Sequence, residues 1–207
     1  MLGSLDTMLF RIPALLLALT VHEYAHGAMS YSLGDPTPKV EGRLTMNPLA
    51  HLDTFGTIML ILVGFGWAKP VQINTRYYRH PKTDIMKVAF AGPGANLVLC
   101  LVGAVLMVIM GKAGMLSNTV LRFLQALMLY NVYFAFFNLL PVPPLDGSKI
   151  LMELLPPEKA YKYEAYVAPY SMYILMGLCL TGLVSTIIVP FASLYLGLVN
   201  MLISIFL

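Results

Sequence analysis

Residues 8–33 read MLFRIPALLLALTVHEYAHGAMSYSL, an apolar run that carries the polar group HEYAH at positions 22–26. A bilayer core of about 30 Å needs roughly 20 apolar residues per helix, so this run is long enough to cross a membrane. A charged side chain at the centre of a bilayer costs at least about 2.5–3.5 kcal/mol. Two histidines and a glutamate at that depth therefore indicate a functional site. The structural alternative is a polar cluster satisfied by neighbouring helices or lining a water-filled path.

The composition of the whole chain also indicates a membrane protein. Of its 207 residues, 58% are hydrophobic and only 11% are charged, and the mean hydropathy is +0.77. An ordinary soluble domain carries roughly 25% charged residues. A soluble globule this apolar could not cover its surface with polar groups, so the excess is expected to face lipid. The net charge of +3 is too small to suggest a nucleic-acid partner.

The distribution of apolar runs predicts an all-α polytopic membrane protein with about six transmembrane helices and short β-like or re-entrant loop segments. We expect one domain over residues 1–207, with a catalytic core at about 8–155 and C-terminal membrane helices at about 167–207. The six runs are residues 8–33, 54–68, 85–110, 120–140, 167–189 and 191–207. Only Pro190 separates the last two, which could be two short tilted helices or one kinked unit. Residues 40–46 and 71–75 alternate weakly and are candidate short strands.

The loops carry the charges that predict orientation. If all six runs cross the membrane, most of the 13 Lys and Arg residues fall on the same side as the two termini. Because basic residues are enriched in cytoplasmic loops, both termini are predicted to be cytoplasmic. We expect the protein to reside in the cytoplasmic membrane of a prokaryote.

The HEYAH group has the spacing of a zinc site. On a helix, positions i and i+4 share one face, so His22 and His26 could bind the same Zn²⁺. Glu23 between them could take a proton from the attacking water. The pattern HExxH is only moderately specific by itself, and its position inside an apolar run strengthens the interpretation.

A hydrolytic zinc ion needs a third protein ligand and an open position. The nearby candidates are His51, Glu41 and Asp53, but none lies on a run expected to pack beside the histidines. Asp146 is the better candidate, because three prolines in the four positions 141–144 interrupt the backbone just before it. Irregular backbone at membrane depth is tolerated where it is buried in protein or lines a wet cavity. The alternative role for Asp146 is an N-cap of the helix that follows.

Two motifs together resemble a known family. HExxH in one apolar run and NLLPVPPLDG at residues 138–147 in a later one are similar to the motifs of the site-2 proteases, the intramembrane zinc metalloproteases. The resemblance covers about residues 8–155 and implies one Zn²⁺ per chain, held by His22, His26 and Asp146, with Glu23 activating water. It also implies that Asn138 holds the substrate carbonyl or its oxyanion. Relatives with PDZ or CBS domains are known, and we expect neither domain here.

Asn138 and three further polar residues can be explained by structural roles alone. For Asn138 itself, a hydrogen bond between membrane helices is nearly as plausible as an oxyanion role. Asn96 ends the small-residue segment AGPGAN, where close helix packing is the favoured role. His51 and His80 are expected at a helix entry and at the membrane interface.

The sequence therefore predicts an intramembrane endopeptidase that acts on transmembrane proteins or signal-peptide-like segments within the lipid bilayer. A membrane metal-ion transporter is one alternative, although its ligands would be spread along a path. The second alternative is a non-catalytic membrane binding protein of the same fold. Such a protein would be expected to have lost Glu23 or a metal ligand, and this sequence retains them all.

Overall fold

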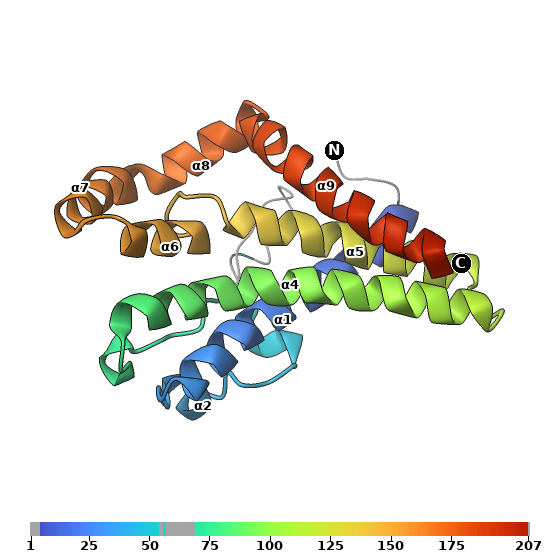
Figure 1. The fold of residues 1–207 in the computed structure, drawn as a ribbon, viewed down its shortest axis with the longest axis horizontal. Coiled ribbons are helices and arrows are strands. Elements are labelled where there is room, and N and C mark those ends of the chain that lie inside the picture. The colour runs from blue at the N-terminus through green and yellow to red at the C-terminus, as the bar shows by residue number, and fades with distance from the viewer. Residues whose placement is uncertain (1–4, 54–55, 57–68, 207) are drawn as a thin grey trace.

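The computed structural model describes residues 5–53, 56 and 69–206, and helices are the only regular elements over those ranges. Four helices are long (Figure 1): α1 (Leu5–Ser32), α4 (Pro81–Lys112), α5 (Asn118–Asn138) and α9 (Leu183–Phe206). The shorter elements are α2 (Thr37–Val40), α6 (Asp146–Leu154), α7 (Pro157–Val167), α8 (Ser171–Leu180) and the 3-10 turns η1 (Pro48–Ala50), η2 (Thr75–Tyr77) and η3 (Ala168–Tyr170).

Local sequence explains where the two central helices meet. Lys112 ends α4, and Gly114 takes a positive φ of 66°, which glycine adopts without steric cost. Ser117 then caps α5 by accepting a hydrogen bond from the backbone N–H of Val120 at 3.3 Å. The short turn makes α4 and α5 antiparallel neighbours.

The core lies where α1, α4 and α5 pack together, and α9 covers α4 and α5 (Figure 1). Side-chain contacts fix the directions: His22 and His26 of α1 reach Asn96 and Val88 of α4, so α1 is antiparallel to α4. Buried apolar residues fill this region, among them Ala14, Cys100, Ala104, Leu127, Val132 and Ala192.

The outer faces of the long helices are apolar. In the described part of the chain, four helices are long and apolar enough to cross a membrane: Met8–Ser32, Pro81–Lys112, Asn118–Asn138 and Leu183–Phe206. Large apolar side chains on them point outward, such as Leu9, Val98 and Leu198. An exposed apolar surface of this extent is what a lipid environment requires.

The C-terminal region differs from the two spans predicted on either side of Pro190. The chain breaks earlier, at Thr181 and Gly182, where Gly182 has a φ of 75°. Helix α9 continues through Pro190, as membrane helices can when other groups compensate the lost backbone hydrogen bond. The ten residues of α8 would extend only about 15 Å, too little to cross a bilayer core. No single helix covers residues 167–189, so a span there is not confirmed, and the predicted span 54–68 lies outside the described residues.

Neither predicted strand forms. Val40 ends α2, which begins beside Pro36 and Pro38, and residues 41–46 form turns and irregular backbone. Residues 71–74 are irregular as well, and the backbone N–H groups of the first and last of them meet side chains instead of a partner strand. Val71 N donates to Glu23 Oε2 at 3.1 Å, and Asn74 N donates to Asp35 Oδ2 at 2.8 Å.

The segments that flank residues 54–68 contact each other. Lys69 N donates to His51 O at 3.0 Å, and the Arg43 guanidinium donates to Lys69 O and Ala50 O. The predicted orientation placed residues 34–53 and 69–80 on opposite sides of the membrane. These contacts show that the two segments meet, and the orientation stays a prediction.

Candidate metal centre

The two histidines of HEYAH face the same side of α1, as an i, i+4 pair should. Their ring centroids are 4.5 Å apart and their Nε2 atoms are 3.0 Å apart. Both side chains are buried. The helix therefore presents two imidazole nitrogens to one point inside the bundle.

The proline-interrupted segment after α5 brings Asp146 to that point. Asp146 Oδ2 lies 3.2 Å from His22 Nε2 and 3.0 Å from His26 Nε2, across 120 residues of sequence from the latter. Leu145 is the N-cap of α6, so the carboxylate of Asp146 faces the histidines and does not cap the helix. A Cβ on Gly147 would lie 2.1 Å from Leu139 O, so glycine permits this tight return of the chain.

The three ligand atoms are suited to a bound cation. They lie within 4.8 Å of one another, and all three residues are buried. His26 Nδ1 is 2.7 Å from Val88 O, and because a carbonyl only accepts, Nδ1 carries the hydrogen and Nε2 of the neutral ring is bare. Acceptor atoms at such distances repel one another, and a cation placed among them would remove that repulsion. Two imidazoles and a carboxylate form a donor set that Zn²⁺ favours.

The backbone of α4 passes unusually close to the pair. A Cβ built on Gly92 would lie 2.4 Å from His26 Nε2 and 2.7 Å from His22 Cε1. Real Cβ atoms do not approach other heavy atoms this closely, so only glycine fits here. The small-residue segment AGPGAN of α4 was expected to pack closely against another helix. That helix is α1, which carries HEYAH.

Glu23 lies on the same turn of α1 as His22 and is half-buried. Its Oε2 accepts a hydrogen bond from the backbone N–H of Val71 at 3.1 Å. One carboxylate oxygen is thus fixed by the chain that follows Lys69 and Pro70, and the other is the oxygen that can exchange a proton.

Asn138 is the last residue of α5 and is buried. Its Nδ2 donates to Phe134 O at 2.9 Å, which engages one of its two amide hydrogens. The ring of Phe134 packs edge-on against His22, with centroids 4.9 Å apart. Asn138 therefore lies one turn beyond a residue that contacts the centre, and its oxyanion role stays a prediction.

Two residues that sequence reasoning did not assign to the centre contact its members. Lys149 Nζ pairs with Asp146 Oδ1 at 2.9 Å, from three residues along α6. Asn96 Oδ1 lies 2.8 Å from His22 Nδ1. The i, i+3 spacing from Asp146 could have indicated Lys149, whereas nothing in the local sequence pairs Asn96 with His22.

The other candidate ligands do not join this group. His51 is fully buried at another place, where its Nε2 lies 2.8 Å from Thr45 O. Among the described residues, the group of possible metal ligands contains His22, His26 and Asp146, and not Glu41 or Asp53.

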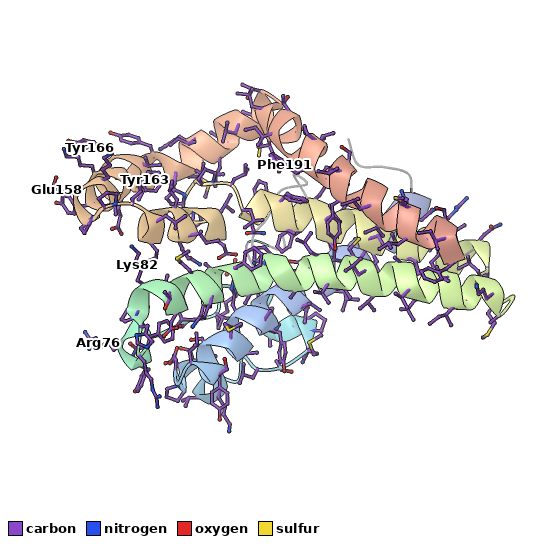
Figure 2. The ribbon with its side chains drawn as sticks, viewed as in Figure 1. Arg76, Lys82, Glu158, Tyr163, Tyr166 and Phe191 are labelled. Atoms are coloured by element: carbon purple, nitrogen blue, oxygen red, sulfur yellow. The ribbon has the colours of Figure 1, made fainter. Side chains whose placement is uncertain are left out.

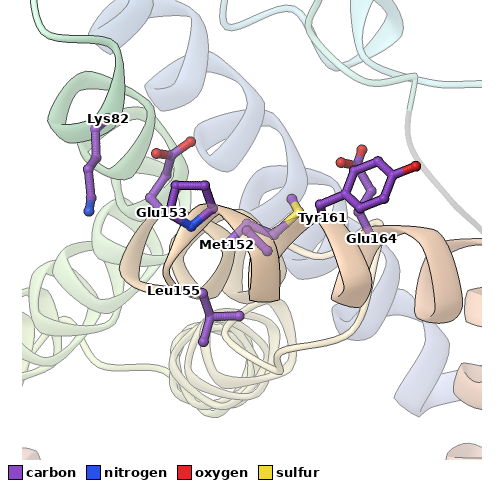
Figure 3. A pocket seen from close by; sticks show the side chains of 8 residues that line it. Lys82, Met152, Glu153, Leu155, Tyr161 and Glu164 are labelled. Carbon is purple, nitrogen blue, oxygen red and sulfur yellow. The ribbon is translucent and has the colours of Figure 1, made fainter.

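A separate open pocket of about 450 Å³ lies between the start of α4 and the helices α6 and α7. Lys82 of α4 lies beside Glu153 of α6, while Tyr161 and Glu164 come from α7 (Figure 3). Met152, Leu155, Pro157 and Ala160 complete its lining. None of these residues belongs to the group of possible metal ligands.

Comparison with known proteins places this geometry in a family. The sequence model of peptidase family M50 matches residues 106–182, which include Asp146 and Asn138. A protein of Bacillus subtilis (strain 168), described as "Putative zinc metalloprotease YwhC", is 38% identical over 191 residues, covering 90% of this chain and 87% of that protein. No solved structure matches the chain significantly.

The mycobacterial relatives are more distant and longer. "Putative zinc metalloprotease Rip2" of Mycolicibacterium smegmatis (strain ATCC 700084 / mc(2)155) is 31% identical over 171 residues, which cover 76% of this chain and 61% of that protein. The protein of the same description from Mycobacterium tuberculosis (strain ATCC 25618 / H37Rv) is 26% identical over 182 residues, covering 83% of this chain and 66% of that protein. The chain therefore belongs to peptidase family M50, the site-2 protease family, and is a zinc metalloprotease of the membrane.

Proposed function

We propose that this chain is a zinc-dependent intramembrane endopeptidase, which hydrolyses peptide bonds within or near the transmembrane segments of other membrane proteins. The observation that carries the proposal is the meeting of His22, His26 and Asp146 inside the helix bundle, with Glu23 on the same turn of α1. Helix α1 is long and apolar enough to cross a membrane, and both histidines lie within that stretch. The centre is thus expected at membrane depth.

The proposed reaction assigns a task to each residue. His22, His26 and Asp146 hold the ion, and Zn²⁺, when bound, supplies Lewis-acid polarisation of the scissile carbonyl and makes water a nucleophile near neutral pH. Glu23 accepts the proton of the attacking water and returns it to the leaving amine. The hydrogen bond from Val71 N keeps the carboxylate oriented for this transfer.

Asn138 is proposed to stabilise the oxyanion of the reaction. One of its amide hydrogens is engaged by Phe134 O, and the second can be donated to a substrate carbonyl. A positioned donor of this kind contributes roughly 2.7–4 kcal/mol to transition-state stabilisation.

We propose one catalytic domain over residues 1–207, with four spans in the part of the chain that the structure describes, in the cytoplasmic membrane of a prokaryote. Its substrates are transmembrane proteins or signal-peptide-like segments. The basic residues near the start of α4 and in α7 favour an orientation with that end in the cytoplasm. The N-terminal end of α1 and the C-terminal end of α9 then face the opposite side, contrary to the prediction from sequence. Asp146 follows α5 at the cytoplasmic end, from which water would reach the centre.

The deciding experiment compares wild-type protein with Glu23→Gln in proteoliposomes that also contain a panel of single-span proteins. We expect Glu23→Gln to retain zinc and to lose cleavage by at least about a hundredfold, because the amide cannot accept the proton. Metal analysis measures zinc, and mass spectrometry of the products locates the cut within or outside the span.

Glu41→Gln is the matched control, because Glu41 is an exposed glutamate in the loop after α2. This variant should cleave as wild type does. Cleavage that survives Glu23→Gln would end the assignment of the general base, and cuts mapped only to soluble loops would end the intramembrane assignment.

A further inference from the structure

Two buried asparagines remain outside the proposed reaction. Asn96 of α4 and Asn131 of α5 are both 0% exposed, at the point where α1, α4 and α5 meet. An amide buried among apolar helices is tolerated when its hydrogen bonds are satisfied. Both amides are engaged here, and their bonds form a chain that ends at His22.

The direction of this chain is fixed by backbone carbonyls. Asn131 Nδ2 donates to Leu127 O at 2.8 Å, and because a carbonyl only accepts, the atom facing Asn96 is Asn131 Oδ1. Asn96 Nδ2 donates to this oxygen at 2.8 Å and to Ala18 O at 2.9 Å. Both amide hydrogens of Asn96 are then engaged, which leaves its Oδ1 to face α1.

The orientation of Asn96 determines which ring nitrogen of His22 carries the hydrogen. Asn96 Oδ1 lies 2.8 Å from His22 Nδ1, and an oxygen acceptor there requires Nδ1 to carry the hydrogen. Nε2 of the neutral ring is then bare, and it is the atom that faces His26 Nε2 and Asp146 Oδ2. With the opposite amide orientation, a donor would face Nδ1 and the hydrogen would move to Nε2.

We infer that Asn131 and Asn96 are positioning residues for zinc binding: together they hold His22 in the one tautomer and orientation that deliver Nε2 to the metal. This inference rests on the proposed function, because it needs a metal bound by His22. Groups that hold the second nitrogen of a metal-binding histidine typically change metal affinity by about 10- to 100-fold when they are removed.

The variants are chosen to separate this role from packing. Asn131→Leu keeps the number and branching of the side-chain heavy atoms but removes the acceptor for Asn96 Nδ2. Asn131→Asp keeps that acceptor, and a protonated carboxyl can still donate to Leu127 O. Tyr195→Phe is the matched control, because Tyr195 OH donates to Leu97 O at 2.8 Å, one residue beyond Asn96 on α4, outside the chain of amides.

Zinc affinity is measured on the full purified chain by competition with a chromogenic chelator. We expect Asn131→Leu to bind zinc about tenfold more weakly, and Asn131→Asp and Tyr195→Phe to bind it as wild type does. Equal affinity of Asn131→Leu and wild type would overturn the inference, and so would an equal loss in Tyr195→Phe. If the wild-type chain itself binds no zinc, the proposed function is contradicted, and this result is distinct from one in which only the variants differ from expectation.

A second measurement reads the tautomer of His22 in the wild-type protein itself. In wild-type protein labelled with ¹⁵N-histidine and loaded with zinc, His22 should show a protonated Nδ1 and a metal-bound Nε2. The chain has four histidines, and His51→Gln and His80→Gln assign the two that lie outside the centre. Zinc bound to Nδ1 of His22 would contradict the inference directly.

Discussion

Asp146 has two carboxylate oxygens, and the structure gives them different partners. Oδ2 faces the two histidines, while Lys149 Nζ holds Oδ1 at 2.9 Å. With zinc bound, Lys149 would hold this oxygen away from the metal and leave Oδ2 of Asp146 as the ligand atom. We expect Lys149→Met to weaken zinc binding about three- to tenfold. This is a small loss for the removal of a group that orients a metal ligand, because the lysine side chain is 42% exposed and solvent screens its charge. Chelator competition measures the change.

Helix α4 offers a closely matched control for this pair. Lys87 Nζ pairs with Asp84 Oδ1 at 2.8 Å with the same i, i+3 spacing, and neither residue belongs to the metal group. Lys87→Met should leave zinc affinity unchanged, and Lys149→Arg should restore most of it. A Lys149→Met protein with wild-type affinity would show that the ion pair does not orient Asp146.

At the level of elements, Asp35 joins the end of α1 to the chain before α4. Its carboxylate accepts hydrogen bonds from Ser30 Oγ at 2.8 Å, Thr37 N at 2.9 Å and Asn74 N at 2.8 Å. Burial by itself raises the pKa of Asp35, but these hydrogen bonds outweigh burial and hold the pKa below its usual value. Since Val71 contacts Glu23, this junction also steadies the proposed base.

A lowered carboxyl pKa makes stability depend on pH in one direction. The charged form of Asp35 is favoured in the folded state, so its stabilisation is complete above the unfolded pKa of about 3.9 and is lost as pH falls through the lower folded value. Asp35→Asn should reduce the free energy of unfolding near neutral pH by about 1–3 kcal/mol, because two backbone donors would then face an amide. Thermal melts in detergent from pH 3 to pH 7 measure it.

Comparing the stability of wild type and Asp35→Asn at each pH isolates the contribution of the Asp35 carboxylate. The stability difference between wild type and Asp35→Asn should narrow below about pH 4. Glu41→Gln, an exposed acid in the neighbouring loop, should show the wild-type profile at every pH. A difference between wild type and Asp35→Asn that stays constant over this range would contradict a role for the charge.

Elements with a local signal were predictable from sequence. The i, i+4 histidines follow from helix geometry, and the prolines of residues 141–144 predicted the break that delivers Asp146. The end of α8 was not predicted, because Gly182 ends that helix whereas Pro190 is accommodated inside α9. The strand predicted at 71–75 failed because Glu23 and Asp35 take its backbone donors, and both residues are distant in sequence. The Asn96–Asn131 contact depends on helix packing, which no local pattern encodes.

At the level of the whole molecule, helix directions place the charges. Tyr195 contacts Leu97, and residues 199–206 pack along residues 101–109, so α9 is parallel to α4. The N-terminal end of α1, the C-terminal end of α4 and the C-terminal end of α9 therefore lie at one end of the bundle. Arg76, Lys82 and Glu158 lie at the other end (Figure 2). That end also holds Lys39, Arg79, Lys87, Lys159 and Lys162, whereas Arg11, Lys112 and Arg122 belong to the first.

This asymmetry gives an orientation that labelling of intact cells can test. In a Cys179→Ser background, where the remaining Cys100 is fully buried, a single cysteine is placed at Ser117 or at Lys159, both exposed at opposite ends. Because basic residues stay in the cytoplasm, a membrane-impermeant maleimide should label Ser117→Cys on intact cells. It should label Lys159→Cys only after the cells are permeabilised. The reverse pattern would contradict this orientation, and it would also contradict the prediction from sequence, which likewise places Ser117 outside and Lys159 in the cytoplasm.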